Sequence, residues 1–175
     1  MVKFDELRGA YRDWRKRGIA YHDASVAFAG NFARGFREYI GAPATYNVID
    51  DTTKKFYVEA RKITDEGKLV RAEHPGEVLT FEEDGYYKFG LTLTLDYDEN
   101  SYPKAAFGFT VHYRAKNDVC DLKVSDKAFT VKLTDEGAFN PAYDFMVEML
   151  KQSFSREPWQ MDEKRQIGFV HLGKD

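Results

Sequence analysis

The alternation of apolar and polar residues between positions 44 and 133 is the feature that most constrains the fold. Runs such as "YYKFGLTLTLDY" (86–97) and "KAAFGFTVHYRA" (104–115) have the period of two expected of half-buried strands. Turn signals such as Asp84-Gly85 and Asn117-Asp118 separate the runs at short intervals, which is typical of strands joined as hairpins. The segment is therefore expected to form a six- or seven-stranded antiparallel meander, folded into a curved sheet.

Apolar residues of the two central runs share one parity. They are Phe89, Leu91, Leu93 and Leu95 in the first run and Phe107, Phe109, Val111 and Tyr113 in the second. Because side chains alternate between the two faces of a strand, these eight residues should form one core-facing surface.

The opposite face of the same strands combines small residues with polar ones. The candidates for binding a ligand or partner on it are Thr92, Thr94, Thr110, His112 and Arg114. A solvated face, with threonine chosen for its strand preference, is the simpler interpretation. Gly90 and Gly108 keep the binding hypothesis open, since glycine in a strand often marks the close approach of another group.

Helical periodicity appears on both sides of the predicted sheet. Phe4, Leu7, Tyr11 and Trp14 recur at three- and four-residue steps before Gly18, which suits a helix C-cap. Trp14 falls on the apolar stripe with Leu7 and Tyr11, where it should be buried. A second helix is expected over residues 23–40, a C-terminal helix from "NPAYDFMVEMLKQSF" (140–154), and a short final strand from "IGFVHL" (167–172). The predicted fold class is α+β, with two N-terminal helices, and residues 1–175 should form a single domain.

The first helix also carries a candidate basic patch. Its members are Arg12, Arg15, Lys16 and Arg17. Trp14 lies between them, a combination that could hold a nucleic-acid backbone and stack a base. Asp5, Glu6 and Asp13 offset this charge, and the whole chain has a net charge of -3, so nucleic acid is the disfavoured partner and a solvated helix face the favoured interpretation.

Recognisable catalytic, metal and cofactor motifs are missing from the sequence. Asp96, Asp98 and Asn100 match three ligand positions of a calcium loop, but Ser101 and Phe107 replace the glycine and the bidentate glutamate that such a loop requires. The lone Cys120 alternates with apolar residues and is expected in the core. We therefore predict no metal site and no cofactor.

The compartment follows from the same composition. A single cysteine excludes an intramolecular disulfide, and the charged N-terminus lacks the apolar run of a signal peptide or membrane span. We expect a soluble, cytoplasmic protein without membrane attachment.

These features favour a non-catalytic binding protein over an enzyme. It would act on a protein partner or hold a small apolar ligand against a helix-backed curved sheet, and a homodimer is a further use of the apolar helix surface. The first alternative is an enzyme whose site is assembled from Asp96, His112 and Arg114. The second is nucleic-acid binding through the basic first helix.

Overall fold

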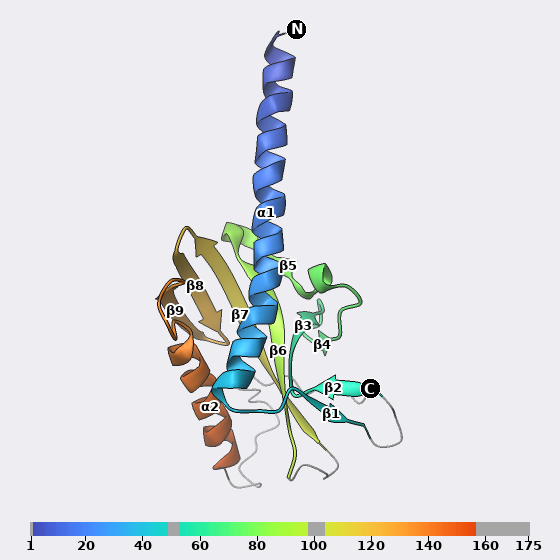
Figure 1. Cartoon of the computed structure of the whole chain (residues 1–175), viewed down its shortest axis with the longest axis vertical. Helices are drawn as coiled ribbons and strands as arrows, with labels where there is room; N and C mark the ends of the chain where they lie inside the picture. The colour runs from blue at the N-terminus through green and yellow to red at the C-terminus, as the bar shows by residue number, and fades with distance from the viewer. Residues whose placement is uncertain (1, 49–52, 98–103, 157–175) are drawn as a thin grey trace.

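The computed structural model describes residues 2–48, 53–97 and 104–156 of the 175-residue chain. Its main feature is an antiparallel sheet of seven strands, against one face of which two helices pack (Figure 1). The mixed α and β content predicted from the sequence is therefore confirmed. The predicted final strand over residues 167–172 lies outside the described residues.

The strands follow one another through the sheet with a single interruption. The order is β4-β3-β6-β7-β8-β9, and β5 pairs separately with β6. Their bounds are β3 Val58–Ile63, β4 Leu69–Val70, β5 Thr80–Phe81, β6 Tyr87–Leu95, β7 Ala105–Lys116, β8 Val119–Val124 and β9 Lys127–Lys132. Two 3-10 turns, η1 Pro75–Val78 and η2 Glu83–Gly85, flank β5, and β1 Thr45–Asn47 pairs with β2 Lys54–Phe56 as a separate ribbon.

The register of β6 and β7 is the one that residue parity predicted. Phe89 lies opposite Val111, and Leu91 lies opposite Phe109. Six of the eight predicted core residues are buried, and the other two, Leu95 and Phe107, are partly buried against the same core. The hydrophobic core therefore lies between this face of the sheet and the helices.

A single helix, α1 Val2–Tyr39, replaces the two helices expected at the N-terminus. The predicted end at Gly18 was wrong, because an isolated glycine costs a helix only about 1 kcal/mol and removes no backbone hydrogen bond. A helix end needs capping geometry as well, and the helix instead ends before Gly41, whose φ of 67° is the left-handed conformation that favours glycine at that position.

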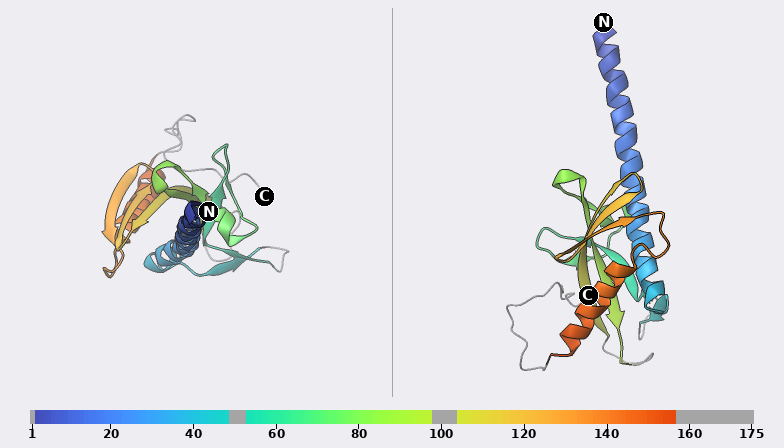
Figure 2. Two further views of the ribbon diagram at one scale, coloured as in Figure 1. Left: turned by 90° about the horizontal axis from the view of Figure 1, so that it is seen from above. Right: turned by 90° about the vertical axis from the view of Figure 1, so that its left-hand side faces the viewer.

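The C-terminal half of α1 packs on the sheet, whereas its N-terminal half extends beyond it (Figures 1 and 2). Phe32 and Phe36 are almost completely buried. By contrast Trp14, which was expected to be buried, has 63% of its surface exposed. That expectation was wrong because periodicity identifies an apolar face but not what covers it.

The second helix, α2 Asn140–Phe154, is confirmed at the predicted position. Tyr143, Met146 and Leu150 are buried, and the Tyr143 hydroxyl donates a hydrogen bond to the backbone carbonyl of Phe32 in α1 (3.2 Å). This bond and the tilted ring contacts of Tyr143 with Phe32 and Phe36 join the two helices over the sheet. No helix in the described part of the chain is long and apolar enough to cross a membrane.

The glycine in β6 marks a close approach, and the group that approaches belongs to the chain itself. A Cβ added at Gly90 would lie 2.3 Å from Leu69 Cδ2. Leu69, in the β3–β4 hairpin, is therefore buried against the sheet face opposite the helices. Part of the space that small residues leave on this face is thus filled by the chain.

Candidate functional site

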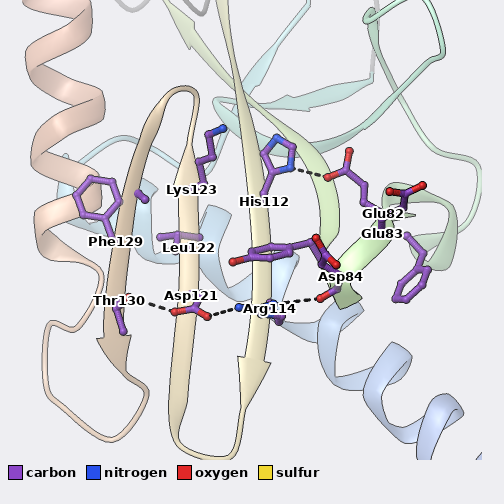
Figure 3. Close-up of a pocket in the computed structure, with 13 residues that line it drawn as sticks. Glu82, Glu83, Asp84, His112, Arg114, Asp121, Leu122, Lys123, Phe129 and Thr130 are labelled. Carbon is purple, nitrogen blue, oxygen red and sulfur yellow. Dashed lines mark hydrogen bonds and ion pairs between the residues drawn. The ribbon is translucent and has the colours of Figure 1, made fainter.

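A cleft of about 990 Å³ lies on the sheet face that points away from the helices (Figure 3). We call it the sheet cleft. Its polar lining comes from strands β7, β8 and β9 and from the η2 segment, and its members include Glu82, Asp84, His112, Arg114, Asp121 and Thr130. His112 and Arg114, predicted from sequence to form one end of this face, do lie together here.

His112 is held by a carboxylate. Its Nδ1 lies 2.7 Å from Glu82 Oε2, and Lys88 Nζ lies 3.0 Å from the other oxygen of the same carboxylate. Burial would raise the pKa of Glu82, but the hydrogen bonds from Lys88 and His112 outweigh it and lower that pKa. An ionised Glu82 accepts a hydrogen bond from Nδ1–H of His112. In the neutral ring, Nε2 is therefore the nitrogen that carries no proton and can accept one.

Arg114 is held by two hydrogen bonds at the other end of the sheet cleft. It donates to Asp121 Oδ2 (2.9 Å) and to the Asp84 carbonyl (3.2 Å), and its guanidinium lies 4.4 Å from the ring centroid of Tyr86. Thr130 donates to the other oxygen of Asp121 (3.1 Å). The hydrogen bond from Arg114 lowers the pKa of Asp121 against the opposing effect of burial.

These pairs limit what the sheet cleft can do chemically. The Glu82–His112 pair resembles the way enzymes orient a general base. However, among the described residues no hydroxyl or thiol is hydrogen-bonded to the His112 ring, so the nucleophile of a covalent mechanism is not in place there. Arg114 is already paired with the Asp121 carboxylate (2.9 Å), and this pairing weakens its attraction for a further anion.

The three predicted threonines lie outside the sheet cleft. Thr92 and Thr94 are buried, and the Thr92 hydroxyl donates to the Glu59 carbonyl (3.2 Å). Thr110 is half-buried, and its carbonyl accepts the Ser125 amide (2.8 Å). The Thr94 amide donates to the Tyr57 carbonyl (2.7 Å). Each of the three threonines thus serves contacts between neighbouring segments of the chain.

Asp96 is not brought together with His112 and Arg114, which corrects the grouping on which the enzyme alternative depended. Leu95 pairs with Ala105, seven residues along β7 from His112, and that places Asp96 roughly 23 Å away. Asp96 instead accepts hydrogen bonds from Tyr57 (2.6 Å) and Lys104 (2.5 Å), which lower its pKa.

Sequence reasoning missed the partners of the two predicted cleft residues. Asp121 could have been found, because it lies directly opposite Arg114 in the β7–β8 pair and shares its face. Glu82 carries no such signal, since it reaches His112 from the segment between β5 and η2.

An apolar pocket of about 420 Å³ lies at the other end of the molecule, between the end of α1, α2 and β6. We call it the helix pocket. Its lining includes Phe36, Ile40, Leu93, Leu150 and Phe154, with Tyr57, Asp96 and Lys151 as polar neighbours. No pattern in the sequence pointed to this space, because its walls come from four segments that lie far apart in the chain.

The protruding half of α1 carries four large apolar side chains in one row, which we call the α1 stripe. It consists of Phe4, Leu7, Tyr11 and Trp14, each between 58% and 67% exposed. Tyr11 and Trp14 stack with ring centroids 5.9 Å apart. Steps of three, four and three residues keep the row on one face of the helix, with the spacing of a coiled-coil seam.

The α1 stripe continues the face that packs on the sheet. Further steps of four and three from Trp14 lead through Gly18, Tyr21 and Ser25 to the buried Phe28 and Phe32. Tyr21 marks the point where the helix leaves the sheet, because its hydroxyl donates to the Gly85 carbonyl in η2 (3.0 Å). The exposed and buried parts of the helix thus share one apolar face.

The predicted basic patch is divided by the helix. Arg12, Arg15 and Lys16 line a shallow groove on one side of α1 together with Arg8, beside Tyr11 and Ile19. Arg17 lies on the other side, because one residue turns an α-helix by about 100°.

Cys120 is buried in the core, as predicted, and burial raises the pKa of its thiol to about 12. Among residues 2–48, 53–97 and 104–156, no group of three or more His, Cys, Asp or Glu side chains could hold a metal ion. Of the acidic loop considered as a calcium site, Asp98, Asn100 and Ser101 lie outside the described residues.

No protein-family model, curated protein or solved structure matches this chain. The sheet cleft, the helix pocket and the α1 stripe are the three surfaces of the described residues at which a function could reside.

Proposed function

We propose that this protein is a binding module that recognises a protein partner through the α1 stripe. The observation that carries the proposal is the exposure of four large apolar side chains in register on a helix that extends beyond its own domain. Single exposed apolar residues are ordinary on protein surfaces, but a contiguous row of aromatic and aliphatic side chains marks an interaction site.

Energetics support the same proposal. Complete burial of an exposed Leu or Phe side chain gains about 1.5–3 kcal/mol, and covering the partly exposed residues of the stripe would gain a share of this for each. Aromatic residues close to arginine are also the composition found at the energetic centres of protein interfaces. Phe4 with Arg8, 4.5 Å from the ring centroid to the guanidinium carbon, is one such pair on this helix.

Photo-crosslinking tests the proposal. A photoreactive phenylalanine analogue replaces Tyr11 in the full chain, expressed in its native host, and the control places it at Asp13 on the far side of the helix. We expect one protein to be captured from position 11 and not from position 13. That protein, purified, should then bind the wild-type chain and lose at least about tenfold in affinity with Leu7→Ala and Trp14→Ala combined. Equal capture at both positions, or affinity unchanged in the double variant, would refute the proposal.

A second candidate function is the binding of a small apolar ligand in the helix pocket. The observation that favours it is an apolar space of about 420 Å³, a size that suits a small molecule, with Lys151, whose ammonium pairs with Glu148 (2.9 Å), among the residues that line it. Titration with a fluorescent fatty-acid analogue tests it. Saturable binding that Leu93→Trp abolishes, while the exposed Val70→Trp leaves it unchanged, is the expected result. Binding that survives Leu93→Trp would exclude the pocket.

A further inference from the structure

We infer that the partner of the α1 stripe is an α-helix with acidic residues flanking its own apolar seam. This inference rests on the proposed function and adds the chemistry of the partner. Three features of α1 support it: the width of the stripe, the placement of charge around it, and the position of the folded domain relative to it.

The width of the stripe fits a helix. The buried half of α1 packs on a sheet with a wide face, which includes Phe28, Ala29, Phe32, Ala33 and Phe36. The protruding half has a narrow seam, one residue wide at each step, and that is the geometry by which two helices pack side by side. Residues 3–20 span roughly 27 Å, enough for about five helical turns of contact.

The charged residues that border the stripe are all basic, although Arg8 also pairs with Asp5 (3.7 Å) and the far side of the helix carries Arg12 and Lys16 beside the acidic residues. Lys3, Arg8 and Arg15 lie at its two edges, in the positions that flank the seam of a coiled coil. Asp5, Glu6 and Asp13 all lie on the far side of the helix, at the angular spacing of about 3.6 residues per turn. The helix carries both positive and negative charges, but a partner on the stripe would contact its basic edges. Acidic residues at the flanks of the partner would complement that charge.

The same border disfavours a second copy of this chain. In a parallel pair of helices each flanking residue meets the opposite flank of the partner helix, and in an antiparallel pair it meets the same flank. Both arrangements would bring Lys3, Arg8, Arg15 or Arg17 against one another, and like charges at these positions are destabilising.

The domain itself disfavours a lipid bilayer. The α1 stripe lies on the face of α1 that packs on the sheet further along, so the sheet occupies the same side of the helix axis (Figure 2). A flat bilayer in contact with Phe4, Leu7 and Trp14 together would collide with the strands. A partner helix fits, because it can end where the η2 turn contacts Tyr21.

The experiment uses designed three-heptad peptides as probes and the full chain with Trp159→Phe, which leaves Trp14 as its only tryptophan. One peptide has leucine at both seam positions and glutamate at the flanks, and the other has lysine at the flanks. Binding is followed by Trp14 fluorescence and by titration calorimetry. The acidic peptide should bind at least about tenfold more tightly than the basic one, since several flanking pairs change sign.

Two matched charge reversals locate the contact. Arg15→Glu, beside the stripe, should weaken binding of the acidic peptide about fivefold and strengthen binding of the basic one. Lys16→Glu makes the same charge change about 100° further round the helix and should alter neither affinity by more than about twofold. Arg15 and Lys16 are both exposed, so the two charge reversals should preserve folding.

Several outcomes would overturn the inference. Equal binding of the two peptides would refute the inference that the partner has acidic flanks. Binding of neither peptide would refute the inference that the partner is a helix. In either case, capture of a protein from position 11 would still support the proposed function. Self-association lost in Trp14→Ala would identify a second copy as the partner. Trp14-dependent binding to phosphatidylcholine–phosphatidylserine vesicles would identify a membrane, and salt-sensitive binding to duplex DNA that Arg12→Gln weakens would identify nucleic acid.

Discussion

The two halves of α1 have the same apolar periodicity and opposite surroundings. In the half that packs on the sheet, Phe32 and Phe36 are covered by aromatic residues of the sheet and of α2. In the protruding half, Leu7 and Trp14 are more than half exposed. The amphipathic pattern alone therefore does not distinguish a helix whose apolar face is covered by its own domain from one whose apolar face is exposed.

The two halves of α1 obtain their stability from different sources. An isolated helix of fewer than about 15 residues is marginal in water, so the protruding turns depend on continuity with the turns that pack on the sheet. Burial of the aromatic face stabilises that second half. A partner on the α1 stripe would bury the apolar face of the first half, as the sheet buries that of the second.

Truncation of one aromatic residue in each half should give the largest difference. Phe32→Ala removes a fully buried ring and should lower the free energy of unfolding by about 3–5 kcal/mol. Trp14→Ala removes a larger ring that the domain does not cover, and the expected change is within about 0.5 kcal/mol. Urea denaturation of both variants measures the difference. A large loss in Trp14→Ala would mean that the stripe is already covered in the isolated chain.

Alanine in place of glycine should act in opposite directions in the two halves. At Gly35 the new Cβ would lie 2.5 Å from the Tyr143 hydroxyl and displace it from its hydrogen bond to Phe32, a loss of about 1–3 kcal/mol. At Gly18 the new Cβ would meet no atom of the described residues within 4 Å, apart from the adjacent backbone of the helix, so the helix gains up to about 1 kcal/mol locally. Thermal unfolding reports the first effect and slower amide exchange near Gly18 the second. Destabilisation by Gly18→Ala would indicate an unseen contact there.

Tyr21 is the boundary between the halves, and its hydroxyl should have a modest effect. Tyr21→Phe removes the hydrogen bond to the Gly85 carbonyl and keeps the ring packed 5.5 Å from that of Tyr87, so a loss of about 0.5–1.5 kcal/mol is expected. Tyr11→Phe on the stripe is the matched control and should be neutral. Equal effects of the two substitutions, measured by urea denaturation, would contradict the boundary.

Acid should lower the free energy of unfolding through Glu82 in the sheet cleft, whereas the apolar side chains of the α1 stripe do not titrate in acid. The pKa of Glu82 is lowered in the folded chain, so its ionised form stabilises the fold above the ordinary glutamate pKa, and that contribution is lost as the pH falls through the lowered value. Its side chain is 30% exposed, which keeps the effect below about 1 kcal/mol. Glu82→Gln should flatten the stability profile between neutral and acid pH. An unchanged profile would exclude the pairing with His112 and Lys88 as its source.

The sequence predicted what depends on local pattern. Alternation in β6 and β7 gave both the strands and the face they bury, because a shift of one residue would have exposed Phe89 and Phe109. The C-terminal helix followed from its apolar steps in the same way. Cys120 was predicted in the core by its apolar neighbours.

What the sequence could not predict depends on contacts between distant segments. Gly90 indicated a close approach, but Leu69 as the approaching residue required the β3–β4 hairpin to curl over the sheet. His112 was singled out without Glu82, since thirty residues separate them in the chain. Trp14 was assigned to the core because nothing in a helical pattern tells how far the sheet beneath it extends.

The most direct test of this account is hydrogen exchange of the full chain, first as a dilute monomer and then with the partner captured from position 11. Without the partner, amides of residues 3–17 should exchange far faster than those of residues 26–36, because this part of the helix is exposed along almost its whole length. With the partner, exchange of residues 3–17 should slow while the rest of α1 stays unchanged. Strong protection of residues 3–17 in the chain alone, or partner-induced protection confined to the sheet, would contradict the proposal that the α1 stripe is an open binding surface.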